Sequence, residues 1–250
     1  MSSFAQDPIH PLAKTILRAF DSGKRMPVGG SVESVEDAYK VQAAVALQKG
    51  PVAGFKAARK PGAVPMSAPI MTAGLVASGG SAASLFGGGL GVELEVGLRL
   101  IGPLPAADDP GFMDALRACV QPVVVIELVD TRLAGPLAEE TLNKLADAQV
   151  NAGLVVGPDL PDWDGGPISQ IAARMRVGDT VLLDGPANVP GGDARESLRA
   201  LAAALGDHCG GLQPGQIVIT GSLHPLTYVA PGTLVEGWIE GFGAISVSIT

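Results

Sequence analysis

The chain has 250 residues, a mass of 25.2 kDa and a formal net charge of −8 at pH 7, with 17 Lys and Arg against 25 Asp and Glu. Such an acidic chain without a basic cluster excludes nucleic acid as a partner, and 47% hydrophobic with 17% charged residues excludes intrinsic disorder. No run approaches the roughly 20 apolar residues of a membrane helix, and the first residues lack the basic start of a signal peptide. We therefore expect a cytoplasmic protein that contacts neither nucleic acid nor membranes.

The first 50 residues predict two helices. Apolar residues at helical spacing mark one face of a helix over 8–22. A second helix is expected to begin at Ser34, where Asp37 completes a capping box, and to continue toward Gly50. We interpret residues 1–50 as a small helical subdomain.

Strands dominate the remainder, which we interpret as one β-rich domain over 51–250. The elements expected up to residue 170 are a strand at 52–58, a loop or lid at 60–89, a strand at 91–102, a helix at 112–118, a strand at 122–130, a helix at 139–149 and a strand at 152–157. After it come strands at 171–177 and 180–185, a helix beginning at Asp193, and strands at 216–221, 233–241 and 244–249. Helices interrupt these strands irregularly, which favours a mixed α+β fold over a doubly wound sheet.

Two glutamates lie close together on the expected strand over 91–102. Glu93 and Glu95 are two residues apart, so their side chains point from the same face of the strand. Like charges side by side repel each other, and glutamate does not favour strands. Taken alone, such a pair is more typical of the solvated outer face of a half-exposed sheet than of a site.

A third carboxylate changes this interpretation. Glu127 lies inside the apolar run VVVIELV, which is typical of a strand buried on both faces. An ionised carboxylate there costs on the order of several kcal/mol unless it is paired or bound to a metal. An ion pair is one interpretation, for which the candidate partners are Lys56, Arg99 and Arg132. The other is a site for Mg²⁺ or Mn²⁺ held by Glu93, Glu95 and Glu127, since carboxylates without His or Cys suit a hard cation.

The order and spacing of several segments together are more specific than any one of them. An E-x-E pair is followed about 34 residues later by E-x-x-D. The segments are GFK (54–56), GVELEVGLRL (91–100), IELVDTR (126–132), LADAQVNAGLVVG (145–157), LQPGQIVITGSL (212–223) and IEGFGAISVSI (239–249). In these the chain resembles the fumarylacetoacetate hydrolase superfamily, and within it the branch of 2-oxopent-4-enoate hydratases and 4-oxalocrotonate decarboxylases, from the opening helices to the C-terminus.

The resemblance implies a fold, a metal and a substrate class. The fold is a mixed β-roll or barrel-like core with a small N-terminal helical part. The metal, Mg²⁺ or Mn²⁺, is held by carboxylates that match Glu93, Glu95 and Glu127, and the family lysine falls on Lys56. Members act on short 2-oxo acids or their dienol forms and assemble as dimers or larger homo-oligomers. Lys56 is then expected to pair with the substrate carboxylate or to move a proton.

Further candidate residues follow from the same segments. In the turn over 219–225, we expect Ser222 to be catalytic and Thr220, Gly221 and His224 to bind substrate, although an ordinary glycine turn with a surface histidine is as compatible with the pattern.

Three polar residues are expected to orient the metal ligands from behind: Asp130, Asp147 and Asn151. Asp130 could instead pair with Arg132.

The sequence departs from the hydratases of this branch where the substrate pocket is expected. Their G-L-T-S-like segment after the lysine is AARKPGAVP here, and the aspartate expected after Pro69 is missing. The M-V-P-V segment after the TGS-like turn is replaced by LTYV at 226–229. The metal site is therefore better supported than the substrate.

The function expected from these observations is a metal-dependent lyase, a hydratase or decarboxylase, that acts on a short 2-oxo acid or its dienol through a metal-stabilised enolate. Hydrolysis in the wider superfamily uses a Glu–His dyad, and no HxxE-like pair lies near the metal strands. Three alternatives remain open: an acylpyruvate-type C–C hydrolase, an oxo-acid tautomerase and a non-catalytic relative that binds an oxo acid. Retention of all three carboxylates argues against the last, since each glutamate without metal would burden the core.

Overall fold

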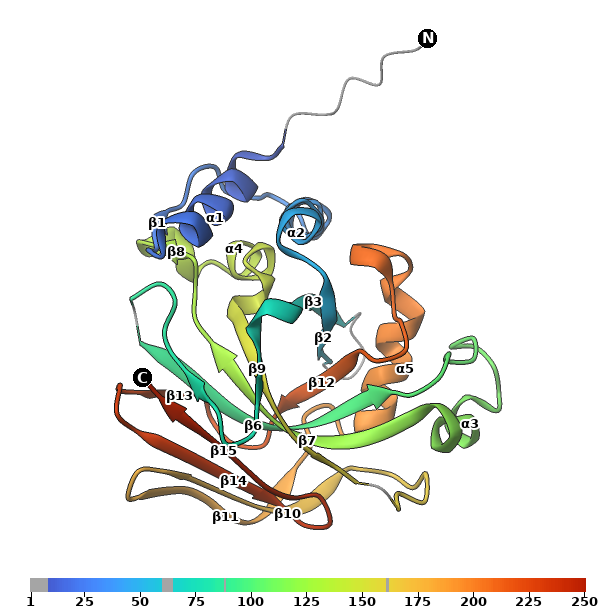
Figure 1. The fold of residues 1–250 in the computed structure, drawn as a ribbon. Helices are drawn as coiled ribbons and strands as arrows, with labels where there is room; N and C mark the ends of the chain where they lie inside the picture. The colour runs from blue at the N-terminus through green and yellow to red at the C-terminus, as the bar shows by residue number, and fades with distance from the viewer. Residues whose placement is uncertain (1–8, 60–64, 88, 161) are drawn as a thin grey trace.

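The computed structural model describes residues 9–59, 65–87, 89–160 and 162–250 (Figure 1). Its helices are α1 (Pro11–Ser22), α2 (Val35–Lys49), α3 (Phe112–Cys119), α4 (Thr141–Ala146) and α5 (Ala194–Leu205). Both expected N-terminal helices are confirmed. At the start of α2, the Ser34 hydroxyl accepts a hydrogen bond from the Asp37 amide at 3.1 Å, as the capping pattern predicted.

The main sheet has eight strands and curls into a half-barrel (Figure 1). Its order is β3-β2-β12-β6-β7-β9-β4, with β13 also paired to β6. The strands are β2 (Val52–Ala58), β3 (Met66–Met71), β4 (Leu75–Ala77), β6 (Leu90–Leu100), β7 (Val120–Val129), β9 (Asn151–Asp159), β12 (Ile217–Ser222) and β13 (Thr227–Val229). Because β3 at one edge contacts β9 near the other, the sheet encloses a small apolar interior. That interior contains Ile70, Val123, Val125, Leu154, Ile217 and Ile219.

A second, five-stranded sheet lies against the outer face of the half-barrel, on the side away from α1 and α2 (Figure 1). Its strands, in spatial order, are β11 (Thr180–Asn188), β10 (Gln170–Val177), β14 (Leu234–Ile239), β15 (Gly243–Ile249) and β5 (Ser81–Ala82). The largest core fills the space between the sheets, where Leu94 of β6 packs with Ile245 and Val247 of β15. The central strands are therefore buried on both faces, and the half-exposed sheet that would solvate Glu93 and Glu95 is not formed.

A separate apolar core joins α1 and α2 to α4, with Leu12, Val41 and Leu145 fully buried in it. The short strand β1 (Met26–Pro27) pairs with β8 (Leu133–Ala134) beside this core. None of the helices in the described part of the chain is long and apolar enough to cross a membrane. The subdomain boundary near residue 50 stays a prediction.

Two expected elements differ from the structure. The segment 60–89, expected as a loop or lid, contains β3, β4 and β5, while residues 60–64 and 88 lie outside the described residues. The helix expected over 139–149 is confined to α4, because the three residues from Ala148 to Val150 all have positive φ angles and cannot continue a right-handed helix. The other strands and helices are confirmed within a few residues.

Candidate metal centre

Strand register brings the three carboxylates together. Glu93 of β6 lies directly opposite Glu127 of β7 in the antiparallel pair, and Glu95 is two residues along β6 on the same face. One carboxylate oxygen from each lies within 4.8 Å of the other two. Glu95 and Glu127 are 0% exposed and Glu93 is half-buried. The structure therefore gathers three acidic groups, two of which have no contact with solvent that could stabilise their charge.

Lys56 is the cation nearest to this cluster. Its ammonium lies 2.8 Å from Glu127 Oε1 and donates a hydrogen bond to the Gln149 carbonyl at 3.4 Å. The other two candidate partners are engaged elsewhere, Arg99 by Asp159 at 3.0 Å and Arg132 by Asp147. One lysine opposes three carboxylates, so the fully ionised cluster carries an excess of negative charge.

Two carboxylate oxygens in the cluster lack a hydrogen-bond partner. Glu95 Oε2 accepts from the Gly221 amide at 2.7 Å, and Glu127 Oε1 accepts from the Asn151 side-chain amide at 2.9 Å. Glu95 Oε1 and Glu127 Oε2 are buried and unpartnered. In each fully buried glutamate, a hydrogen bond thus holds one carboxylate oxygen in place, and the other oxygen is left to bind a cation. This donor set of carboxylate oxygens fits a hard divalent cation such as Mg²⁺ or Mn²⁺.

Burial and mutual repulsion shift the pKa values of these groups. Burial, with the nearby charge of Glu127, raises the pKa of Glu93 to about 7 and that of Glu95 well above its ordinary value. Burial alone would lower the pKa of Lys56, but the charges of Glu127 and Glu95 outweigh it and raise that pKa. Without a metal the cluster therefore retains protons that a free glutamate would lose.

The last residues of β12 and the turn that follows them contribute groups with different roles. Gly221 and Ser222 line the pocket above the carboxylates, and Ser222 lies opposite Glu95 in the strand register. Thr220 is buried and donates its hydroxyl hydrogen bond to the Val96 carbonyl at 3.2 Å. His224 is also buried: Nε2 accepts from the Leu94 amide at 3.0 Å and Nδ1 bonds the Pro225 carbonyl at 2.7 Å. Both ring nitrogens of His224 are thus engaged by backbone, so the ring positions the turn.

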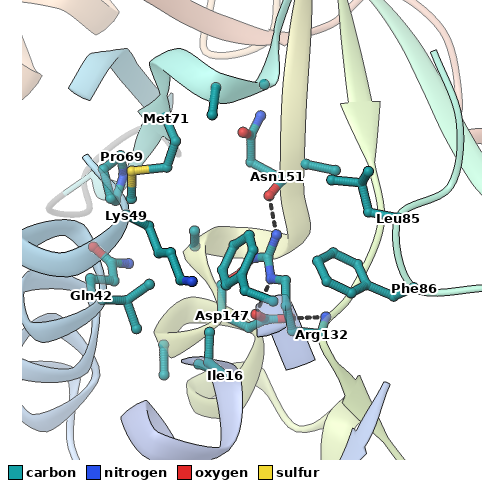
Figure 2. Close-up of a pocket in the computed structure, with 17 residues that line it drawn as sticks. Ile16, Gln42, Lys49, Pro69, Met71, Leu85, Phe86, Arg132, Asp147 and Asn151 are labelled. Atoms are coloured by element: carbon teal, nitrogen blue, oxygen red, sulfur yellow. Dashed lines mark hydrogen bonds and ion pairs between the residues drawn. The ribbon is translucent and has the colours of Figure 1, made fainter. Parts of the chain in front are cut away.

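The three polar residues expected behind the ligands lie at different distances from them. Asn151 contacts Glu127 directly. Asp147 acts one step further back: it binds the Arg132 guanidinium, which also donates to the Asn151 carbonyl (Figure 2). Asp130 does not pair with Arg132. It accepts from Arg25 at 2.8 Å and from Ser84 at 2.8 Å, and so fastens the segment before β6.

Gln149 is a candidate that the sequence reasoning missed. Its side-chain amide nitrogen is buried without a partner, and the residue lines the same pocket as Lys56 and the carboxylates. It sits in the middle of the left-handed turn over 148–150, with φ angles of 52°, 49° and 56°. Such angles are unfavourable for alanine, glutamine and valine, and they cluster at functional sites. No sequence pattern signals this turn, since none of its residues is a glycine.

The pocket above the cluster has a volume of about 390 Å³ and is open to solvent on one side. Its lining includes Lys56 and Glu93, and also Lys144 and Glu139, which form an ion pair at 2.7 Å. A volume of this size suits a small metabolite. The arrangement can therefore hold a cation and a short organic anion side by side.

Comparison with known proteins places the chain in a family. A sequence model described as the C-terminal domain of fumarylacetoacetate (FAA) hydrolase matches residues 55–250. Among solved structures, 4-oxalocrotonate decarboxylase from Pseudomonas putida G7, complexed with magnesium and adipate, has a TM-score of 0.78 at 19% identity, with 96% of each chain covered. This similarity includes the N-terminal helices and confirms the expected mixed α+β fold with a barrel-like core.

Other solved structures are similar over a smaller part of the chain. A 2-hydroxyhepta-2,4-diene-1,7-dioate isomerase from Mycobacterium marinum has a TM-score of 0.59 at 14% identity and covers 80% of this chain and 76% of its own. Fumarylpyruvate hydrolase from Pseudomonas aeruginosa, in complex with Mn²⁺ and pyruvate, has a TM-score of 0.58 at 17% identity, with 78% and 88% covered. At these identities the fold is shared, whereas the reactions differ among the neighbours.

Proposed function

The chain belongs to the fumarylacetoacetate hydrolase family, and from this premise we propose that it is a divalent-metal-dependent lyase, a hydratase or decarboxylase, acting on a short 2-oxo acid or its dienol. The observation that carries the proposal is the pair of unpartnered buried oxygens, Glu95 Oε1 and Glu127 Oε2, beside Lys56. Buried carboxylate oxygens without a donor are rare, and a bound cation would satisfy both.

Glu93, Glu95 and Glu127 are the residues that would hold Mg²⁺ or Mn²⁺. The bound ion supplies positive charge that draws the carboxylate and keto oxygens of a 2-oxo acid and stabilises negative charge on the keto oxygen. The hydrogen bonds from Gly221 and Asn151 fix the orientation of two of these carboxylates before substrate arrives.

Lys56 is the proposed catalytic residue. Its ammonium carries a proton at neutral pH, since the neighbouring carboxylates raise its pKa. Nζ belongs to a residue that lines the pocket, where it can bind the substrate carboxylate or deliver a proton to C3, the carbon next to the keto group. The aspartate expected after Pro69 is replaced by Ile70, which is fully buried inside the half-barrel and cannot donate a proton.

Gln149 and Ser222 are the proposed substrate-binding groups of the pocket. The Ser222 hydroxyl donates a hydrogen bond to the His224 carbonyl at 2.5 Å, which it would have to give up to act in catalysis. The unpartnered amide nitrogen of Gln149 would donate a hydrogen bond to a substrate oxygen. Gly221, whose amide already serves Glu95, shapes the wall by its backbone. Thr220 and His224 would act indirectly, by holding this turn.

The positions of the histidines support lyase chemistry over hydrolysis by a Glu–His dyad. All three histidines of the chain are described, and none lines the pocket. His10 caps α1, His208 bonds Gln42 at 2.9 Å, and His224 is engaged by backbone. The match to 4-oxalocrotonate decarboxylase along almost the whole chain supports the same branch. We also propose that the protein acts in the cytoplasm as a homo-oligomer.

The proposal is tested by turnover and metal binding in Glu95→Gln. This variant keeps an acceptor for the Gly221 amide but removes one charge, and unlike Glu127→Gln it leaves Lys56 its partner. With the dienols of unsaturated 2-oxo acids and Mg²⁺, we expect a wild-type hydratase to remove the dienol ultraviolet band. With unsaturated 2-oxo diacids, we expect a wild-type decarboxylase to release CO₂. We expect Mg²⁺ affinity to fall at least about 100-fold in Glu95→Gln. Turnover that persists in the variant or in EDTA would contradict the proposal.

A further inference from the structure

A second cavity lies between the N-terminal helices and the edge of the main sheet (Figure 2). Its volume is about 170 Å³, and most of its lining is apolar. Side chains from α1, α2, β3 and the segment before β6 converge on it, namely Ile16, Phe20, Val45, Met71, Leu85 and Phe86. This cavity is separate from the pocket above the metal centre, because neither Lys56 nor any of the three carboxylates lines it.

The size and chemistry of this cavity fit a single ring. An apolar cavity of about 150 Å³ in another protein stays dry and takes up benzene. Phe20 and Phe86 stand edge to face, with their ring centres 5.5 Å apart, and present apolar surface to the space. A ring or a branched chain of similar size would therefore be buried against aromatic and aliphatic side chains.

Two polar side chains of the lining are already satisfied. The Arg132 guanidinium is occupied by Asp147 and by the Asn151 carbonyl (Figure 2). The Gln42 amide donates to the carbonyls of Ser67 and Leu145. Arg132 and Gln42 therefore have few hydrogen-bond donors left for a ligand in the cavity.

Lys49 is different. Its only ion-pair partner among the described residues is Asp21, at 2.9 Å, whose side chain is 71% exposed. Nζ lies 5.4 Å from the centre of the Phe20 ring, and Figure 2 shows the side chain extending from α2 toward the other lining residues. An ammonium has three donors, so Lys49 can bind an anion at the rim while the cavity holds an apolar body.

We propose that this cavity is a binding site for a small monocarboxylate with a ring-sized apolar body, of the benzoate class. The carboxylate pairs with Lys49, and the ring lies against Phe20 and Phe86. Charge and shape both select this class. A dianion would leave one charge without a free cation, because Arg132 is already paired with Asp147, and a small polar acid would leave the apolar walls uncovered.

The test is thermal unfolding with benzoate or benzene, in the presence of Mg²⁺ and oxalate so that the metal pocket is filled. Four proteins are compared: the wild type, Val45→Phe, which fills the cavity, Lys49→Met, which removes only the charge, and Lys40→Met, the control on the exposed side of the same helix.

We expect both ligands to raise the midpoint of the wild type and of Lys40→Met. Val45→Phe should respond to neither ligand. Lys49→Met should bind benzene as the wild type does but benzoate about fivefold more weakly, the contribution of one partly exposed ion pair. A wild type that responds to neither ligand would overturn the proposal, as would benzoate binding that survives in Val45→Phe. Should Val45→Phe not fold, Lys49→Met decides: unchanged benzoate affinity there overturns the carboxylate assignment.

Discussion

At the scale of single residues, the site is defined by what its buried atoms lack. Glu95 and Glu127 each have one oxygen fixed by an amide and one without a partner, and Gln149 has an unpartnered amide nitrogen. Desolvation makes such atoms costly in an empty site and favourable once a cation and a substrate oxygen fill it. The same unpartnered atoms thus destabilise the metal-free protein and bind the cation and the substrate.

The protonation of the cluster predicts an unusual pH dependence of stability. The folded-state pKa of Glu93 is about 7, above the ordinary value of 4.5, and that of Glu95 is raised as well. Between pH 4.5 and about pH 7, the folded chain therefore binds more protons than the unfolded chain, so the free energy of unfolding falls as pH rises. In EDTA we expect a decrease of about 2 kcal/mol between pH 5 and 7 from this cluster, allowing for the partial exposure of Glu93.

Denaturant unfolding at several pH values measures this slope. Saturating Mg²⁺ should reverse it, since the cation competes with protons. The double variant Glu93→Gln, Glu95→Gln is the control. Without metal, its free energy of unfolding should not show this decrease between pH 5 and 7. A wild-type slope equal to that of the control would show that the carboxylates are not coupled to folding.

Gln149 can be tested without disturbing its backbone. Glycine tolerates the φ of 49° at this position, so Gln149→Gly removes the side chain and keeps the turn. We expect oxalate to bind the Mg²⁺ form of this variant about tenfold more weakly, from the loss of one hydrogen bond to a charged group. Ala148→Gly, in the same turn but facing the other cavity, is the matched control and should bind oxalate normally. Equal affinity in the two variants would rule out contact between Gln149 and substrate.

At the scale of elements, strand pairing positions Lys56. β2 runs parallel to β12, which runs antiparallel to β6, so Lys56 of β2 comes to lie near Glu127 although 71 residues of sequence separate them. A close approach of β2 to β12 is required, and Gly54 permits it: a Cβ atom there would lie 1.9 Å from the Ile217 carbonyl oxygen. The glycine of the GFK segment is thus a packing requirement.

Gly54→Ala is therefore expected to destabilise the protein by about 3 kcal/mol or more, since backbone atoms must move to admit the methyl group. It should also weaken substrate binding by displacing Lys56. Gly102→Ala is the control, because its new Cβ would meet its nearest neighbour at an ordinary 3.6 Å. Thermal unfolding of both variants measures the difference, and equal midpoints would refute the packing argument.

The elements also show how far sequence reasoning reaches. A charged residue in the apolar run around Glu127, and the spacing of Glu93 and Glu95, led to two interpretations, an ion pair or a cluster of three carboxylates. The structure shows both, because Lys56 pairs with Glu127 inside the cluster. The choice of Lys56 over Arg99 and Arg132 depends on strand order, which local patterns do not encode. The short strands within 60–89 were missed because glycine, alanine and serine there give no strand periodicity.

At the scale of the whole molecule, the half-barrel and the second sheet together keep the central strands dry on both faces. That is why the two glutamates of β6 line a pocket that opens to solvent on one side, instead of lying on a fully solvated sheet face. The N-terminal helices add a wall and a second cavity rather than metal ligands. The fold class followed from strand content and irregular helices, whereas the curl of the sheet follows from pairings far apart in sequence.

The central claim is that three carboxylates hold a divalent cation that in turn binds a 2-oxo acid. Thermal unfolding of metal-stripped protein, with Mg²⁺ or Mn²⁺ and with or without oxalate, tests it most directly, because oxalate presents the same pair of oxygens. We predict a rise of the midpoint by about 5–10 °C at metal concentrations 100-fold above Kd. Oxalate should raise it further, and only when metal is present. No shift with either cation would contradict the account.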